Sequence, residues 1–193
     1  MSDLVKNILL VGVGGQGTIL TSKILAAGLV ELGYDVKMAE IHGMSQRGGS
    51  VVTQVRYGEE VFAPNIDLGA ADVIVSFEKV EALRMLPYLK KGGVVVADKK
   101  EIFPVSVLAG GAYYPHETFE AISGTGATLH VVPASEKAEE LGNGKVQNIC
   151  LLGALIKVLK LEGVDWERIV GEMVPAKVKE LNLLAFKAGF EMV

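Results

Sequence analysis

Three glycines near the amino terminus have the spacing of an anion-binding turn. Gly12, Gly14 and Gly17 follow the apolar run 7–11 and match the G-x-G-x-x-G pattern of dinucleotide-binding turns. Because glycine has no Cβ, the backbone of such a turn can approach a ligand closely. The first amides of a following helix add unpaired N–H donors and a partial positive charge. The segment therefore predicts a site for a nucleotide-like ligand.

Gly15 and Gln16 complete this turn, and two alternatives for it stay open. The neutral amide of Gln16 can hydrogen-bond a ligand or a partner without demanding a charge. Glu40 stands about 20 residues further on, where a dinucleotide binder holds a ribose, and this predicts an NAD-type oxidoreductase. Against that alternative, no general acid–base pair and no substrate domain follow in the sequence. The glycines can also be purely structural and let the next helix pack on the sheet.

A second glycine-rich segment, at 40–50, reads EIHGMSQRGGS. Its candidate binding residues are Ser45, Arg47, Gly48 and Gly49. An arginine can place a planar fork on a phosphate or a carboxylate, and the glycines beside it permit a nest of backbone N–H groups. His42 is either a proton donor or a structural histidine. We interpret the segment as a ligand-binding loop or an interface.

Composition excludes several other classes of function. The chain of 193 residues spreads 19 basic and 23 acidic side chains along its length, so it offers no field that would hold nucleic acid. Its single cysteine, Cys150, excludes an internal disulfide and cannot supply the four thiolates that an iron–sulfur cluster usually takes. We expect Cys150 to be an inert core thiol. The three histidines lack metal-ligand spacing, so no metal site is predicted.

The elements that must position these segments follow from hydrophobic period and from glycine and proline. Predicted strands cover 6–13, 35–41, 50–57, 72–77, 93–98 and 128–132. Predicted helices cover 15–33, 79–90, 135–141, 146–161, 165–173 and 175–188. We expect 50–57 to form a hairpin with 61–63, and 99–126 to be loops with at most one or two short strands. Asp165 is expected to cap its helix, and the apolar helix 146–161 to be buried.

These elements predict an α/β fold in a single domain spanning 1–193. We expect three α/β/α layers, a mostly parallel, mixed sheet with a Rossmann-like first βαβ unit, and a helical C-terminal third. Half of the residues are hydrophobic, yet no uninterrupted run reaches the roughly 20 apolar residues of a membrane span. No secretory leader pattern opens the chain, so a cytoplasmic location without membrane attachment is expected.

Three segments together resemble the gamma subunits or domains of the 2-oxoacid:ferredoxin oxidoreductase family. They are 12–17 (GVGGQG), 40–51 (EIHGMSQRGGSV) and 146–155 (VQNICLLGAL). The most specific part is 42–50, which simple nucleotide-binding folds do not share. A free-standing chain of this length, without a fused alpha region or ferredoxin cysteines, is most similar to the small subunits of the indolepyruvate branch. The small chain of a pyruvate or branched-chain 2-oxoacid enzyme is the alternative.

The resemblance implies a share in an oxidative decarboxylation. In that family a 2-oxoacid, coenzyme A and oxidised ferredoxin give an acyl-CoA, carbon dioxide and reduced ferredoxin. Thiamine diphosphate, Mg²⁺ and 4Fe-4S clusters are expected on a large partner subunit, ferredoxin is met through the complex, and this chain alone is expected to bind no cofactor. Its glycine turn and Arg47 would suit the phosphates of coenzyme A. A stand-alone NAD enzyme and a binding module without a catalytic complex are the competing classes.

Overall fold

The computed structural model describes residues 5–42 and 49–193, and within them a six-stranded sheet has the strand order β2-β3-β1-β4-β5-β6. The strands are β1 (Lys6–Val13), β2 (Asp35–His42), β3 (Ser50–Gly58), β4 (Ala71–Ser76), β5 (Leu89–Ala97) and β6 (Thr128–Val131). The longer helices are α1 (Thr18–Glu31), α6 (Gln147–Leu159), α7 (Trp166–Met173) and α8 (Lys179–Glu191). The shorter ones are α2 (Lys79–Met85), α3 (Val105–Leu108), α4 (Thr118–Ser123) and α5 (Ala134–Glu140). Single 3-10 turns are η1 (Leu86–Tyr88), η2 (Gly144–Val146) and η3 (Ala176–Val178).

The sheet is mixed, as expected, with one antiparallel strand among the six. β1, β4, β5 and β6 run parallel to one another, and β3 runs antiparallel to both β1 and β2. β1 and β2 are therefore parallel, as in a Rossmann-like unit, but β3 lies between them. All the parallel strands end at one edge of the sheet, here called the carboxyl edge.

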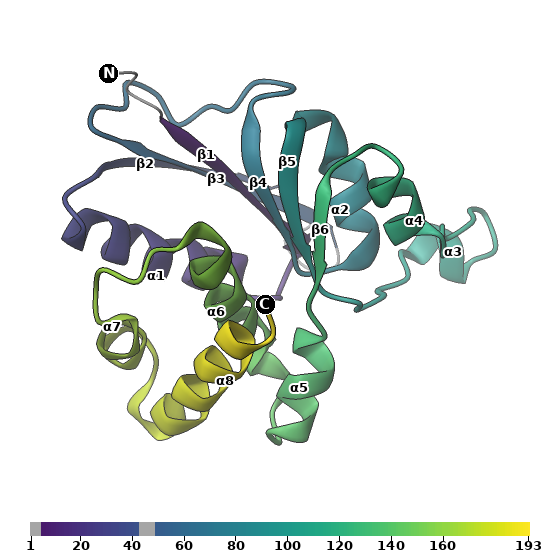
Figure 1. Ribbon diagram of the computed structural model, residues 1–193. Helices are drawn as coiled ribbons and strands as arrows, with labels where there is room; N and C mark the ends of the chain where they lie inside the picture. Colours follow the sequence, from purple (N-terminus) through teal and green to yellow (C-terminus); the bar gives the residue numbers. More distant parts are fainter. Residues whose placement is uncertain (1–4, 43–48) are drawn as a thin grey trace.

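Helices cover both faces of the sheet and make the three predicted layers (Figure 1). Side chains alternate along a strand, so β1 sends Ile8 and Leu10 into one core and Leu9 and Val11 into the other. The first core lies under α1, α5 and α6, with α7 and α8 packed outside them, and the second lies under α2 and α4. Helices of the C-terminal third thus thicken one face of the sheet.

The predicted hairpin between 50–57 and 61–63 is wrong. β3 has its partners in β1 and β2, and the chain after it forms no strand in the described residues before β4. Hydrogen bonds to side chains hold the segment between β3 and β4 in place instead. Val61 N donates to Asp35 Oδ2 over 2.8 Å, and Ile66 N donates to Gln54 Oε1 over 2.6 Å.

Smaller differences concern where elements begin and end. The short strands allowed within 99–126 do not form, and the two short helices α3 and α4 lie there. The helix predicted at 79–90 ends at Met85, because Pro87 cannot continue it and β5 begins at Leu89. The predicted N-cap is confirmed, since Asp165 Oδ1 accepts a hydrogen bond from Arg168 N over 3.0 Å. In the described part of the chain, no helix is both long and apolar enough to cross a bilayer.

Helix α6 is buried as its sequence predicts, between the sheet and α8. The two helices approach so closely that glycine is required at the crossing. A Cβ at Gly189 of α8 would overlap the carbonyl oxygen of Cys150, and a Cβ at Gly153 of α6 would lie 2.8 Å from Phe190 N. This crossing holds the start of α6 against the carboxyl edge of the sheet.

Candidate functional site

The glycine turn joins β1 to α1 at the carboxyl edge. Gly17 caps α1 with a φ of 83°, a left-handed conformation that favours glycine. A Cβ there would lie 2.5 Å from Asn148 Nδ2, because the start of α6 packs directly on the turn. Asn148 Nδ2 also donates to the Gly17 carbonyl over 3.4 Å. The sequence predicts this strand–turn–helix correctly, but not that α6 would lie beside it.

Gln16 is engaged inside the protein at both ends of its amide. Its Oε1 accepts from Val13 N over 2.7 Å, and its Nε2 donates to the Phe77 carbonyl over 2.6 Å. Gln147, the first residue of α6, donates to the same carbonyl over 2.8 Å. Gln16 therefore ties β1 to the end of β4. Both ends of the amide are thus already hydrogen-bonded within the protein, and the predicted contact of Gln16 with a ligand or a partner stays a prediction.

Replacing Gln16 by alanine is expected to lower the free energy of unfolding by roughly 1 to 3 kcal/mol, since the buried Val13 N–H loses its acceptor. Urea denaturation of the isolated chain measures this loss. Lys23→Ala on the exposed face of α1 is the control and should change stability by less than about 0.5 kcal/mol. A Gln16→Ala chain as stable as wild type would return Gln16 to the ligand-contact hypothesis.

The second glycine-rich segment meets the glycine turn near its carboxyl end, at Gly49. Gly49 O accepts a hydrogen bond from Gly14 N over 2.8 Å. The next residue, Ser50, donates its hydroxyl to Glu81 Oε2 over 2.5 Å. The predicted site residues Ser45, Arg47 and Gly48 lie outside the described residues, so their part in a site stays a prediction.

A cleft of about 620 Å³ opens beside the glycine turn. It is lined by Gly15, Gln16, Gly17, Lys100, Glu139, Asn143, Gly144, Lys145 and Gln147. Two lysines and one glutamate give the lining a net positive charge. Within residues 5–42 and 49–193, neither Lys100 nor Lys145 has a carboxylate oxygen within 4.0 Å. The cleft therefore combines glycine-turn backbone with two ammonium groups that are available to an anion.

Neither Lys100 nor Lys145 is predicted as a site residue from the sequence. Lys100 follows the carboxyl end of β5, which is where ligands of open α/β sheets commonly bind. This position after a predicted strand is the one feature of the sequence that could have identified Lys100 as a site residue. Lys145 lies in the 3-10 turn before α6, and only the packing of α6 on the glycine turn brings it to the cleft.

Buried carboxylates lie at the same edge, and their oxygens are already used. Asp98 accepts from Ser135 N and from Ser135 Oγ, each over 2.9 Å. Glu78 accepts from the first amides of α2 and from two groups further along the chain. Burial raises the pKa of the Asp98 carboxyl and that of Glu81 above their ordinary values. These groups brace the turns that follow β4 and β5.

The raised pKa of the Asp98 carboxyl predicts that the free energy of unfolding depends on pH. The protonated carboxyl gives its full stabilising contribution below the unfolded pKa, near 3.8, and this contribution is lost as pH rises through the higher folded pKa. The free energy of unfolding of an Asp98→Asn variant, relative to that of wild type, should therefore increase as pH rises. This difference should become constant above the folded pKa of Asp98. Urea unfolding of both chains across this range measures the difference. Asp67→Asn, at an exposed carboxyl, controls for the change of charge. A difference that shrinks with rising pH would contradict the assignment.

The geometry disfavours a dinucleotide site. Glu40 lies on β2 opposite Thr53 of β3, and β3 separates it from β1. Since neighbouring strands lie about 4.8 Å apart, Glu40 is displaced by one strand from the place where a Rossmann acid meets the ribose. The glycine turn therefore lacks the acidic partner on the adjacent strand that NAD binding uses.

Cys150 is buried in α6, and burial raises the pKa of its thiol to about 12. This confirms the prediction of an inert core thiol, because the thiolate is the reactive form. Among the residues that the structure describes, no three His, Cys, Asp or Glu side chains gather as metal ligands would.

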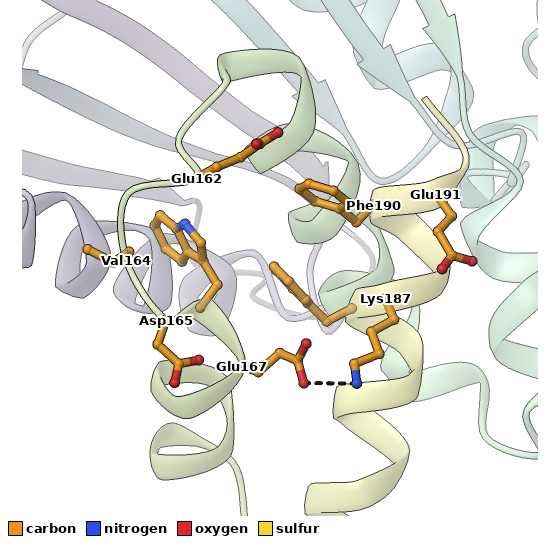
Figure 2. Close-up of a pocket in the computed structure, with 9 residues that line it drawn as sticks. Glu162, Val164, Asp165, Glu167, Lys187, Phe190 and Glu191 are labelled. Atoms are coloured by element: carbon orange, nitrogen blue, oxygen red, sulfur yellow. Dashed lines mark ion pairs between the residues drawn. The ribbon is translucent and has the colours of Figure 1, made fainter.

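A second pocket, of about 320 Å³, lies between α7 and α8, with Phe190 and four carboxylates among its lining residues (Figure 2). Lys187 bridges the two helices through an ion pair of 3.0 Å with Glu167 (Figure 2). Trp166, which also lines it, packs on Gly28 of α1 and belongs to the core. The pocket contains none of the glycine-turn residues, and we assign it a packing role.

Comparisons with known proteins bear on the family and the fold. The chain matches the pyruvate ferredoxin/flavodoxin oxidoreductase family over residues 7–192. It is 40% identical to indolepyruvate oxidoreductase subunit IorB of Thermococcus kodakarensis, across 95% of this chain and 93% of that protein.

Two solved structures share the fold. The gamma subunit of a keto/oxoacid ferredoxin oxidoreductase from Geobacter sulfurreducens PCA superposes with a TM-score of 0.71, at 25% identity and 97% coverage of both chains. A 2-oxoglutarate:ferredoxin oxidoreductase from Magnetococcus marinus, with 2-oxoglutarate, coenzyme A and succinyl-CoA bound, superposes with a TM-score of 0.77 at 24% identity. That alignment covers 99% of this chain and 31% of the other.

Proposed function

Because this chain belongs to the pyruvate ferredoxin/flavodoxin oxidoreductase family, we propose that it is the small subunit of an enzyme that oxidatively decarboxylates indolepyruvate or a related aryl 2-oxoacid. Its place as a small subunit of a 2-oxoacid:ferredoxin oxidoreductase follows from relatives and structures that match it over nearly its whole length. The choice of an aryl substrate is supported by the 40% identity to an indolepyruvate oxidoreductase subunit. The reaction joins the acyl group of the 2-oxoacid to coenzyme A, releases carbon dioxide and passes two electrons to ferredoxin.

The groups that perform the redox chemistry belong to a large partner subunit in this proposal. Thiamine diphosphate with Mg²⁺ supplies the carbanion-stabilising chemistry there, and iron–sulfur clusters take the electrons. This chain has one cysteine, and it is buried in the core. The chain's own share is to complete the complex and to offer an anion-binding cleft at the carboxyl edge.

We assign that cleft to the phosphates of coenzyme A. Its volume of about 620 Å³ lies within the roughly 300 to 1,000 Å³ usual for cofactor sites. The single observation that supports this assignment most is that Lys100 and Lys145 share the cleft with the glycine turn. Phosphate oxygens suit both ammonium groups and turn amides. Ser45, Arg47, Gly48 and Gly49 would complete the site, since Gly49 is hydrogen-bonded to Gly14.

Reconstitution tests the function. The chain is co-purified with its large subunit, and ferredoxin reduction is followed with indolepyruvate, pyruvate or 2-oxoglutarate, with and without coenzyme A. We expect kcat/KM for indolepyruvate to exceed the other two at least tenfold, reduction to require coenzyme A, and the isolated chain to be inactive. Equal or faster turnover of pyruvate would move the protein to another branch of the family. Reduction of NAD by the isolated chain would refute the assignment.

A further inference from the structure

The segment from Ile102 to His116 exposes apolar side chains that the fold does not use. Val105 is 80% exposed, Leu108 is 71% exposed and Tyr113 is 79% exposed. Val105 and Leu108 lie on the short helix α3 and Tyr113 follows it, and α3 lies outside α4 at the margin of the molecule (Figure 1). Single exposed apolar residues are ordinary on a protein surface, but several together mark an interaction site. This segment is called the apolar arm below.

One buried carboxylate fastens both ends of the apolar arm. Glu78 Oε1 accepts from Ile102 N over 3.1 Å and from the hydroxyl of Tyr114 over 2.5 Å. Its other oxygen, Oε2, accepts from the amides of Val80 and Glu81 at the start of α2. The arm is therefore tied at its base to the turn that follows β4.

Aromatic contacts stiffen the arm further. The rings of Phe103 and Tyr114 meet edge to face with centroids 4.8 Å apart, and the His116 ring lies 5.3 Å from Tyr114. Glu101, which directly precedes the arm, is held to α2 by an ion pair with Lys79 at 3.0 Å. Because the arm is already ordered, a partner that binds it does not have to fix a flexible loop, and this lowers the entropic cost of association.

The position of the arm identifies the partner. It begins two residues after Lys100, which lines the candidate cleft, so both features leave the same edge of the sheet. Under the proposed function, the thiol of coenzyme A bound in that cleft must reach a thiamine adduct on the large subunit. The large subunit then has to cover the carboxyl edge and the arm beside it. We infer that the apolar arm docks into an apolar surface of the large subunit, an inference that rests on the proposed function.

The size of the arm fits this role. We take roughly 150 Å² as the full area of one large apolar side chain. The exposed fractions of four side chains then add up to an area on the order of 400 Å², and these are Val105, Leu108, Tyr113 and Phe103. A stable protein interface takes about 800 Å² from each partner. The arm can supply about half of that area, and the neighbouring carboxyl edge can supply the rest.

The test compares two double variants of the full chain. Val105→Asp with Leu108→Asp places charges on the arm, and Phe62→Asp with Leu68→Asp places them on residues that are 87% and 68% exposed before the start of β4, at the opposite edge of the sheet. Melting of each isolated chain checks folding, and titration calorimetry with the large subunit measures affinity. We expect the arm variant to bind at least tenfold more weakly, the control variant to bind within twofold of wild type, and both to melt as wild type does.

A milder pair guards against misfolding. Val105→Ala with Leu108→Ala keeps α3 helical and should still weaken binding severalfold. Wild-type affinity in both arm variants would overturn the docking inference while the proposed function stood. A wild-type chain that binds no large subunit would overturn the proposed function and the inference with it. Loss of self-association in the arm variants, with the large subunit bound normally, would assign the arm to a second copy of this chain and refute the inference.

Discussion

Gly189→Val is expected to lower the free energy of unfolding by about 3 kcal/mol or more. A Cβ at this position would overlap the carbonyl oxygen of Cys150, and neither helix backbone can yield without breaking the α6–α8 crossing. Overpacking a core usually costs about 1 to 3 kcal/mol and occasionally more, and here the added atoms meet a backbone carbonyl rather than a side chain that can turn away. Urea denaturation at neutral pH measures the loss.

A valine elsewhere on α8 is the matched control for this prediction. Leu184 is exposed on the same helix, so Leu184→Val adds the same β-branched residue at the cost of helix propensity alone, a few tenths of a kcal/mol. Equal losses in the two variants would show that propensity, and not the crossing, sets the effect. Because α6 begins beside the glycine turn, we also expect Gly189→Val to weaken assembly with the large subunit.

The crossing illustrates what the sequence can and cannot predict about this fold. Helix 146–161 is apolar nearly all round, so its burial follows from pattern alone. The pattern does not predict that α8 packs on this helix, because a glycine in a helix is equally compatible with an exposed face and with a backbone contact. The same limit explains why the predicted hairpin is wrong. The residues of β3 alternate between apolar and polar as those of a hairpin strand do, and only long-range pairing places β3 between β1 and β2.

The candidate site divides in the same way. The glycines of 12–17 are local signals, since a strand, a turn and a helix follow one another in the chain, and the structure places them as predicted. From the sequence, the neutral amide of Gln16 predicts a contact with a ligand or a partner, whereas in the structure its Oε1 accepts from the nearby Val13 N. The other end of the amide, Nε2, donates to the Phe77 carbonyl, which is 61 residues away. Lys100 and Lys145 lie in segments without a motif, and the tertiary fold brings them together.

Replacing Lys100 and Lys145 by glutamine is expected to raise the KM for coenzyme A by about tenfold each, and by up to about a hundredfold together. A contact from an ammonium group to a phosphate is made equally in the ground state and the transition state, so kcat should change little. Both lysines lie in the cleft without a carboxylate partner among the described residues, so neither change leaves a buried charge behind. Steady-state kinetics of the reconstituted enzyme measures the effect.

Pantetheine and added salt sharpen this test. Pantetheine carries the thiol of coenzyme A without its phosphates, so the double variant and wild type should use it with the same KM. Wild-type KM for coenzyme A should rise with salt, and the double variant should be less sensitive, because salt screens exposed charges. Lys99→Gln is the matched control, since Lys99 neighbours Lys100 but pairs with Glu136 over 3.5 Å and does not line the cleft. If Lys99→Gln had the same effect as the double variant, or the defect persisted with pantetheine, the lysines would act through the general field or the fold, and the cleft would not hold the phosphates.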